Sequence, residues 1–455
     1  MFKKILIANR GEIAIRVIRA CNEMGIKTVA VYSKTDNNSL HVKFADEAIC
    51  IGKGPALESY LNIPRIISAG EITNADAIHP GYGFLAENAQ FSKICKENGF
   101  TFIGPDSEII DLMGDKVNAR NAAKNAGVPI IPGSNILSSI EELKEIAERI
   151  GYPVMLKAVA GGGGKGMRII DNSKEAEKGF NIIQNEAGMA FNNSEIYVEK
   201  FIENGRHIEV QVLSDKFGNH IHLGERECSI QRSNQKLIEE SPSLFVDDFL
   251  RSELTSNALN LAKKVNYVGV GTIEFLVDEE KNFYFIEMNT RIQVEHTVTE
   301  MVYMIDLIKE QIRIHFGEVL PIKQKDISMN GHAIECRINA EDPFNDFIPS
   351  PKKIESLNFA GGIGVRIDSF IYAGYHIPTN YDSMLGKLIV HSSSREKALI
   401  RMKRALQETF IEGPKTTLPL LKIIFENKDF NNGNFDINFL GKFLKKIKEK
   451  ENESS

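Results

Sequence analysis

The stretch EMNTRIQVEH, residues 287–296, places a polar or charged side chain at every second position directly after the apolar run FYFI. In an extended chain, side chains at positions i, i+2 and i+4 share one face. The spacing therefore predicts a single polar row of Glu287, Asn289, Arg291, Gln293 and Glu295. A solvated edge strand alternates in the same way, but such a face is usually built from Lys, Ser and Thr. We interpret the row as the lining of a cleft, because clustered titratable groups indicate a site.

A further acidic residue is predicted to face the start of this row. The segments GTIEFLV and FYFIEMN flank the turn DEEKN, and a hairpin centred on Glu280–Lys281 places Glu274 nearly opposite Glu287. Two carboxylates about 4 Å apart repel by roughly 4 kcal/mol at an effective dielectric constant near 20, and like charges facing each other destabilise a sheet. A Mg²⁺ ion removes this conflict, and Asn289 could join it. One protonated acid or a shifted register is the alternative.

A glycine run and a lysine in an apolar strand indicate a nucleotide site. The run AGGGGKGM (160–167) lies between two predicted strands, and no Ser or Thr follows Lys165, so it is not a P-loop. We interpret it as a flap whose backbone N–H groups close over phosphates; a flexible surface loop is the alternative. Lys157 interrupts the preceding strand, and a buried lysine is rare without an anion. Lys116 would add positive charge, and YVEKFI (197–202) would offer a backbone hinge to adenine.

The composition excludes several classes of protein. The chain has 455 residues, of which 42% are hydrophobic and 25% charged, as is ordinary for a globular protein of several domains. A formal net charge of −6 argues against nucleic acid as the main ligand. The five cysteines form no CxxC pair, which is typical of the reducing cytosol. No segment has the length of a signal-peptide core or a membrane span. We therefore expect a cytoplasmic protein without a membrane partner.

The order of strand and helix patterns predicts several α/β units. Residues 1–110 alternate strands with helices, which indicates a parallel sheet. A helix over 116–125 leads to a small α/β module that begins near residue 131, and a strand-rich region follows over about 206–316. Residues 331–392 are predicted to form strands and turns, after which come a helix and an amphipathic tail that frays.

Together these motifs resemble the ATP-grasp arrangement and, more narrowly, the biotin carboxylases, which carboxylate biotin in acetyl-CoA carboxylase and related enzymes. The stretches that carry the resemblance are, in order, ILIANRGEIAIRVIRA, HPGYGFLAEN, GGGGKGM, CSIQR, EMNTRIQVEH and GHAIECRINAEDP. The resemblance implies an α/β and α+β multidomain fold. Its parts would be an N-terminal parallel α/β domain (1–112), an ATP-grasp region (113–316) with a mobile glycine-rich lid (about 131–203), a C-terminal mixed β domain (331–445) and a frayed tail (446–455).

The resemblance also implies a role for individual residues. The ATP site would comprise Lys116, Lys157, Gly163, Gly164, Glu199, Lys200, Ile202, His207, Asn234, Glu274 and Glu287. Mg²⁺, or alternatively Mn²⁺, would be bound by Glu274, Glu287 and Asn289. Bicarbonate would be bound by Lys236, Arg291, Gln293, the backbone of Val294 and the base Glu295. Biotin would lie near Tyr82, Gln231 and Arg337, and Arg337 would stabilise the enolate-like form of its ureido group.

The implied activity is ATP- and bicarbonate-dependent carboxylation of biotin through carboxyphosphate. Because the chain shows no AMKM-like attachment site and no room for a carboxyltransferase, we expect a separate biotin carboxyl carrier protein and separate carboxyltransferase subunits. Acetyl-CoA carboxylase, which supplies malonyl-CoA to fatty acid synthesis, is the favoured parent complex. The alternatives are a split pyruvate or propionyl-CoA carboxylase, another ATP-grasp ligase, or a non-catalytic ATP-binding subunit.

A few positions depart from the family pattern or leave two interpretations open. Ser233 and Asn234 stand where Arg and His are common, so the affinity for ATP is expected to change. Arg337 shares a strand face with Glu335 and Asn339, and without the resemblance it would be interpreted as part of a surface ion pair. Family members are commonly homodimers, and Arg19 and Glu23 on the first helix would serve such an interface or form an ordinary helix pair worth a few tenths of a kcal/mol.

Overall fold

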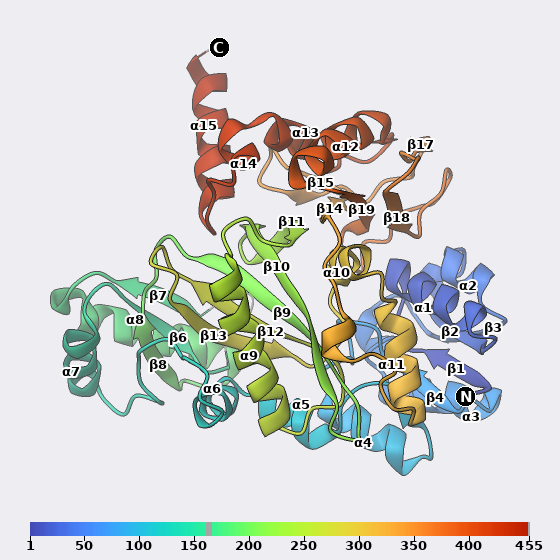
Figure 1. Cartoon of the computed structure of the whole chain (residues 1–455), viewed down its shortest axis with the longest axis horizontal. Helices are drawn as coiled ribbons and strands as arrows, with labels where there is room; N and C mark the ends of the chain where they lie inside the picture. Colours follow the sequence, from blue (N-terminus) through green and yellow to red (C-terminus); the bar gives the residue numbers. More distant parts are fainter. Residues whose placement is uncertain (161–165, 454–455) are drawn as a thin grey trace.

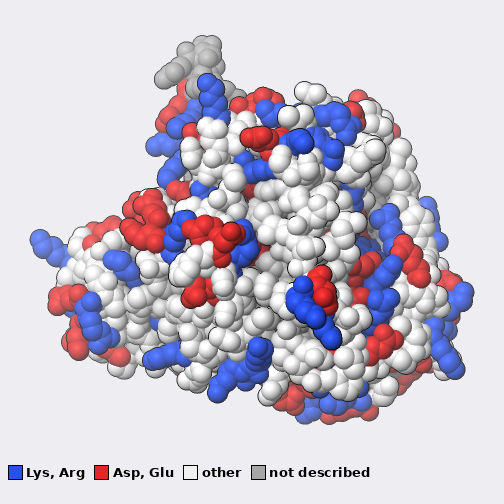
Figure 2. Space-filling model, in the orientation of Figure 1, with Lys and Arg blue, Asp and Glu red and all other residues white. Residues whose placement is uncertain are grey.

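The protein is described here by a computed structural model that covers residues 1–160 and 166–453. Figure 1 shows three regions: the N-terminal layers at the right, a small module at the lower left, and C-terminal helices at the top above long central strands. On the face drawn in Figure 2, Lys and Arg side chains are interspersed with Asp and Glu over the surface. None of the helices in the described ranges is long and apolar enough to cross a membrane.

The N-terminal region is the parallel α/β unit predicted from the alternating pattern. Its five strands pair in the order β3-β2-β1-β4-β5, all in parallel. The strands are β1 (Lys4–Ile7), β2 (Lys27–Ser33), β3 (Glu47–Gly52), β4 (Ala77–His79) and β5 (Thr101–Phe102). The helices are α1 (Gly11–Glu23), α2 (Leu40–Phe44), α3 (Ile63–Thr73), α4 (Ala89–Glu97) and α5 (Ser107–Gly114). The central strand β1 reads KILI and is almost completely buried, as expected when helices cover both faces of a sheet.

A small three-stranded module follows α6 (Lys116–Asn125). Its antiparallel strands pair in the order β7-β6-β8 and are β6 (Val154–Ala158), β7 (Met167–Ile170) and β8 (Ile196–Lys200). Two helices pack on the module, α7 (Ile140–Ile150) and α8 (Ser173–Phe191). Helix α7 begins where Ser139 accepts a hydrogen bond from the backbone N–H of Glu142, and it buries Leu143 and Ile146 against the sheet.

One antiparallel sheet runs through the rest of the molecule, in the order β13-β12-β9-β10-β11-β14-β19-β18. Its strands are β9 (Arg206–Ser214), β10 (His220–Arg232), β11 (Gln235–Ser241), β12 (Gly269–Val277), β13 (Phe283–Asn289), β14 (His332–Asn339), β18 (Val365–Ser369) and β19 (Met384–Ser392). Short strand pairs join β15 (Glu341–Asp342) to β16 (Ile348–Pro349) and β17 (Leu357–Asn358) to β20 (Phe410–Ile411). The sheet therefore continues across the predicted boundary between the ATP-grasp region and the C-terminal domain.

Helices complete this part of the fold. Those between the strands of the large sheet are α9 (Asp248–Lys264), α10 (His296–Tyr303) and α11 (Leu307–Phe316). The C-terminal helices are α12 (Arg395–Glu408), α13 (Leu418–Glu426), α14 (Lys428–Asn431) and α15 (Phe439–Glu453), and the first of these occupies the predicted helical segment. Helix α15 continues to Glu453, further than the predicted start of fraying at residue 446.

The prediction of one continuous polar strand over residues 287–295 is wrong beyond Asn289. Strand β13 ends at Asn289, and the chain then turns into α10, which begins at His296. The turn has a physical cause in the N-terminal region, because the carboxylate of Glu87 accepts the backbone N–H of Thr290. In addition, Ile292 is fully buried in the core that contains β1 and α1. The polar side chains still meet, but they come from a strand end and a turn.

Candidate active site

Lys236 on β11 is the centre of a buried cluster of acids. Its Nζ donates to Glu209 Oε2 at 2.6 Å, to Glu274 Oε1 at 3.0 Å and to Glu295 Oε1 at 2.6 Å. An ammonium has three N–H donors, so each is used. Burial works against the charge of Lys236, but the three carboxylates outweigh burial and raise its pKa well above the usual value. Lys236 is therefore a positive charge that three carboxylates hold in place.

Glu295 lies between two cations, Lys236 and Arg337. Its Oε2 accepts from Arg337 Nη2 at 3.0 Å, while Arg337 Nε donates to Glu239 Oε1 at 2.6 Å. Although burial opposes ionisation, Lys236 and Arg337 lower the pKa of Glu295 well below the usual range, so the carboxylate is ionised at neutral pH. The side chain of Arg337 is only 15% exposed, so its interpretation as part of a surface ion pair is wrong.

The remaining predicted bicarbonate residues surround the same point. Arg291 donates from Nε to Glu87 Oε2 at 2.8 Å and from Nη2 to Asn289 Oδ1 at 2.9 Å. Gln293 Nε2 donates to Glu274 Oε1 at 2.7 Å. The carbonyl oxygen of Val294 accepts from the buried Lys387 Nζ at 2.7 Å. The turn after β13 is thus held at several points around Lys236 and Glu295.

The predicted facing of Glu274 and Glu287 is confirmed by the register of β12 and β13, which pairs these two residues. The side chain of Glu287 reaches solvent, but protein atoms also pack around its carboxyl group. This partial burial, together with the charge of Glu274, raises the pKa of Glu287. Asn289 Nδ2 donates to Glu274 Oε1 at 2.8 Å. Paired carboxylates whose charges conflict are suited to a divalent cation, so these residues fit Mg²⁺.

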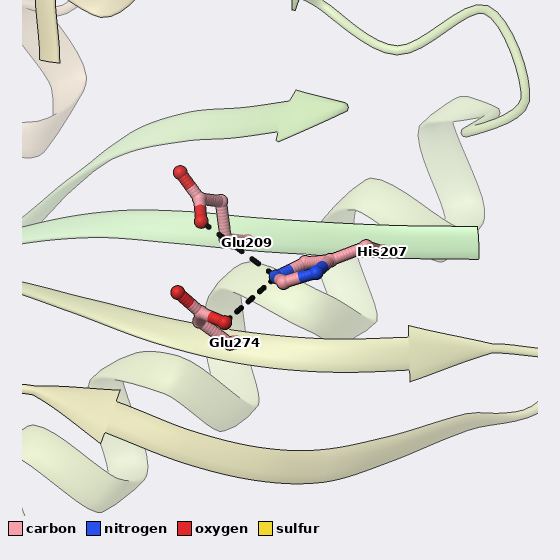
Figure 3. A group of neighbouring side chains, drawn as sticks. All are labelled: His207, Glu209 and Glu274. Atoms are coloured by element: carbon pink, nitrogen blue, oxygen red, sulfur yellow. Dashed lines mark ion pairs between the residues drawn. The ribbon is translucent and has the colours of Figure 1, made fainter. Parts of the chain in front are cut away.

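His207 on β9 joins the acidic cluster. Figure 3 shows its ring pointing between Glu209 and Glu274, with Nε2 2.7 Å from Glu274 Oε2 and 3.8 Å from Glu209 Oε2. Burial opposes protonation, but Glu274 is the main influence that raises the pKa of His207. Among the described residues, these three side chains also lie close enough together to share a metal ion.

The predicted phosphate-binding lysines lie near the small module. Lys157 Nζ pairs with Glu199 Oε2 at 2.6 Å, and Lys200 Nζ donates to the carbonyl oxygen of Gly151 at 2.8 Å. Burial and the neighbouring charge of Lys157 lower the pKa of Lys116. Two lysines that repel each other in a partly buried place form a site suited to phosphates. Gly163 and Gly164 lie outside the described residues.

The other predicted residues lie at the edges of the site. Ile202 is half-buried between β8 and β9, and Asn234 is exposed. Ser233 and Asn234 both have positive φ at the tip of the β10–β11 hairpin, a geometry that Asn tolerates well. Gln231 borders a cavity of about 570 Å³ beside this tip. The hydroxyl of Tyr82 donates to the buried carboxylate of Glu12.

Two features of this region, the contacts of Arg120 and the pairing of two acids, were not predicted from the sequence. Arg120 donates both to Glu199 and to the carbonyl oxygen of Ile131, and its signal was its place four residues after Lys116 on one helix face. Glu239 and Glu335 face each other on β11 and β14. Burial is the main cause that raises the pKa of Glu239 to about 7 and that of Glu335 to about 8.

The chain was compared with protein families and known proteins. Three family models match it: "Biotin carboxylase, N-terminal domain" over residues 1–110, "Carbamoyl-phosphate synthase L chain, ATP binding domain" over 115–323, and "Biotin carboxylase C-terminal domain" over 335–442. Biotin carboxylase 1 of Bacillus subtilis is 54% identical over 442 residues, which are 97% of this chain and 98% of the relative.

Two solved structures of biotin carboxylases match this chain over nearly its full length. The biotin carboxylase domain dimer of Hydrogenobacter thermophilus 2-oxoglutarate carboxylase, in complex with MgADP, ADP and bicarbonate, superimposes with a TM-score of 0.93 at 53% identity, covering 97% of this chain and 98% of that one. The biotin carboxylase subunit of a pyruvate carboxylase gives a TM-score of 0.86 at 52% identity, with the same coverage of 97% and 98%.

Proposed function

The chain belongs to the biotin carboxylase family, and on that premise we propose that it carboxylates biotin on a separate carrier protein through carboxyphosphate. As a biotin carboxylase it is an ATP-dependent ligase that uses ATP, Mg²⁺ and biotin. The observation that supports the proposed mechanism most strongly is the position of Glu295, whose two oxygens accept from Lys236 and Arg337. A base flanked by two cations suits a substrate that is both an anion and a proton donor.

The proposed reaction begins with bicarbonate held by Lys236, Arg291 and Gln293. Bound bicarbonate would share the positive charge of Lys236, which raises the basicity of Glu295 when it is needed. Glu295 takes the proton, and the bicarbonate oxygen then attacks the γ-phosphorus of ATP as the bond to ADP breaks. Mg²⁺ bound at Glu274 and Glu287 would neutralise charge on the phosphates.

Carboxyphosphate then splits into CO₂ and phosphate, and the phosphate accepts the ureido proton of biotin. Arg337 would stabilise the negative charge that develops on the ureido oxygen, since a fixed donor costs no reorganisation. The deprotonated ureido nitrogen attacks CO₂. The proposed ATP-binding residues remain Lys116, Lys157, Gly163, Gly164, Glu199, Lys200, Ile202, His207, Asn234, Glu274 and Glu287. Tyr82 and Gln231 are proposed to lie beside biotin.

The proposed activity is tested by phosphate release from MgATP with and without bicarbonate, and with free biotin added. We expect release that requires bicarbonate and that biotin stimulates. The variant Glu295→Gln keeps the shape of the side chain but removes the base, so it should lower the bicarbonate-dependent rate by about 10²–10⁴-fold. Release that is indifferent to bicarbonate and to this substitution would point to another ATP-grasp ligase.

For the parent complex we propose acetyl-CoA carboxylase, with a biotin carboxyl carrier protein and carboxyltransferase subunits as partners and malonyl-CoA as the product for fatty acid synthesis. The relatives include parts of 2-oxoglutarate and pyruvate carboxylases, so the choice needs its own test. A complex copurified with the chain should be supplied with ATP, bicarbonate and, in separate reactions, acetyl-CoA, pyruvate, propionyl-CoA or 2-oxoglutarate. Malonyl-CoA formation supports the proposal, and carboxylation of another acceptor overturns it.

We further propose that the chain acts in the cytoplasm as a homodimer. Arg19 and Glu23 pair with other residues rather than with each other. Arg19 lies 3.9 Å from Asp368, and Glu23 pairs with Lys309 at 2.5 Å. Arg19 is 49% and Glu23 65% exposed, so both can meet a partner. Light scattering should give twice the chain mass, and Arg19→Glu should shift the mass toward the monomer. A wild-type monomer at micromolar concentration would contradict the proposal.

A further inference from the structure

Arg226 on β10 is a fully buried guanidinium beside the proposed bicarbonate site. A guanidinium carries five N–H donors in a fixed plane. All five donate, each to a different side chain: Nε to Glu209 Oε1, Nη1 to Gln211 Oε1 at 2.7 Å and Thr299 Oγ1 at 2.9 Å, and Nη2 to Thr272 Oγ1 at 3.0 Å and Gln293 Oε1 at 2.7 Å.

A β-bulge brings Arg226 to this position. The register of β9 and β10 shifts between His222 and Glu225, so that Arg226 faces Glu209. Without the extra residue Arg226 would face Ile208, whose side chain belongs to the core beneath α9. The bulge thus turns a buried cation toward the polar face of the sheet.

Two of the five acceptors belong to the site itself. Glu209 uses its other oxygen, Oε2, to hold Lys236 at 2.6 Å. Gln293 gives its Oε1 to Arg226, which leaves its Nε2 directed at Glu274 and the interior of the site. The two ends of an amide have nearly the same shape, so only the neighbouring hydrogen bonds decide which end points inward.

We propose that Arg226 is a positioning residue for bicarbonate: it fixes the amide of Gln293 with its N–H end inward and, through Glu209, it fixes Lys236. The inference rests on the proposed function, because the inward N–H end favours ligand binding only if the ligand is an anion. A reversed Gln293 would present a carbonyl oxygen to bicarbonate and repel it. Arg226 itself stays behind this layer and contacts no substrate.

The first test is the variant Arg226→Lys, which keeps the charge but has only three donors. The Michaelis constant for bicarbonate should rise about tenfold or more, because hydrogen bonds to charged groups are lost, while that for ATP changes less than about threefold. The same substitution in a Gln293→Ala background should have a smaller effect than in the wild type, since the route through the amide is gone and only the route through Glu209 remains. Equal rises for both substrates, or an undiminished effect in the Gln293→Ala background, would overturn the inference.

A second variant covers the case in which Arg226→Lys fails to fold. The double substitution Thr272→Val and Thr299→Val removes two acceptors of Arg226 and leaves its charge and the site residues in place. We expect about a threefold rise in the Michaelis constant for bicarbonate. Thr255→Val is the matched control, because in the part of the chain that the structure describes this buried hydroxyl donates only to carbonyls of its own helix, at 2.8 and 3.3 Å. The same rise in the control, or no rise in the double variant, contradicts the inference; wild-type turnover without bicarbonate would instead overturn the proposed function on which it rests.

Discussion

We propose that one residue, Arg337, serves two steps: it holds the proposed base Glu295, and it stabilises the negative charge on the ureido group of biotin. The cation of Arg337 lies 3.0 Å from the base and 2.6 Å from Glu239, so it is fixed before any substrate arrives. A donor that is already oriented stabilises developing charge without reorganisation. We therefore propose that this fixed guanidinium acts on the ureido oxygen of biotin.

The substitution Arg337→Ala should impair the carboxylation of biotin while leaving the binding of ATP largely intact. Loss of a preorganised donor costs about 3–4 kcal/mol, or 10²–10³ in rate, so carboxylation of free biotin should fall by that factor. Binding of ATP, measured by calorimetry, should change little. Arg404→Ala is the control, because this arginine pairs with Glu408 at the surface. An equal loss of biotin carboxylation and ATP binding would refute the role given to Arg337.

The acid stability of the fold should depend on His79 at the end of β4. Burial and then His315 lower its pKa to about 3, against about 6.5 in the unfolded chain. A depressed histidine pKa means that the unfolded chain takes up the proton first. The stabilisation is thus complete above pH 6.5, and about 2 kcal/mol of it is lost between pH 6.5 and pH 5.

The substitution His79→Asn tests this dependence. Asn offers an oxygen in place of Nδ1, which accepts the backbone N–H of Gly81 at 3.0 Å, and it does not titrate. Urea unfolding at pH 7 and pH 5 should show a smaller loss of stability on acidification in the variant than in the wild type. His376→Gln at an exposed position should leave the loss unchanged. If all three proteins lost the same stability between pH 7 and pH 5, His79 would not titrate as described.

At the scale of elements, the bulge in β10 is the feature on which the site depends. Gly224 lies in it with φ of +58°, and an added Cβ would come within 2.0 Å of Tyr303 Oη. A side chain there is strained twice, by the left-handed backbone and by the contact. The bulge therefore requires glycine at position 224. Because the bulge decides to which side of the sheet Arg226 points, the orientation of Arg226 depends on this glycine as well.

Gly224→Ala should lower the stability by about 2–4 kcal/mol and reduce bicarbonate-dependent turnover. Gly218→Ala is a matched control at φ of +86°, where nothing lies within 4 Å of the added Cβ. It should cost only about 1 kcal/mol. Thermal unfolding and turnover of both variants are the measurements. A Gly224→Ala protein as stable as Gly218→Ala would mean that the bulge adapts.

Local patterns in the sequence were enough to predict elements whose structure depends on near neighbours. Helix α6 occupies the predicted residues 116–125, and the turn DEEKN was enough to predict the pairing of Glu274 with Glu287. The end of β13 could not be predicted, because Glu87 causes the turn from 203 positions away. Arg226 was missed for the same reason: its five acceptors come from β9, β12, α10 and the turn before α10.

At the scale of the whole molecule, the proposed active site lies where the large sheet meets the N-terminal region. The large sheet supplies Glu274, Lys236 and Arg337 from β12, β11 and β14, and the N-terminal region supplies Glu87. Lys387 on β19 links the N-terminal region to the turn after β13. It pairs with Glu12 of α1 at 3.3 Å and donates to the carbonyl oxygen of Val294 at 2.7 Å. A shift between these regions would therefore move the turn that we propose to bind bicarbonate.

We propose above all that this chain activates bicarbonate by phosphorylating it. The most direct test is a turnover with ¹⁸O-labelled bicarbonate, MgATP and free biotin, followed by mass spectrometry of the released phosphate. Attack by a bicarbonate oxygen on the γ-phosphorus and later cleavage of the C–O bond leave that oxygen on phosphorus. The account predicts one labelled oxygen in each phosphate. Unlabelled phosphate formed alongside carboxybiotin would contradict it.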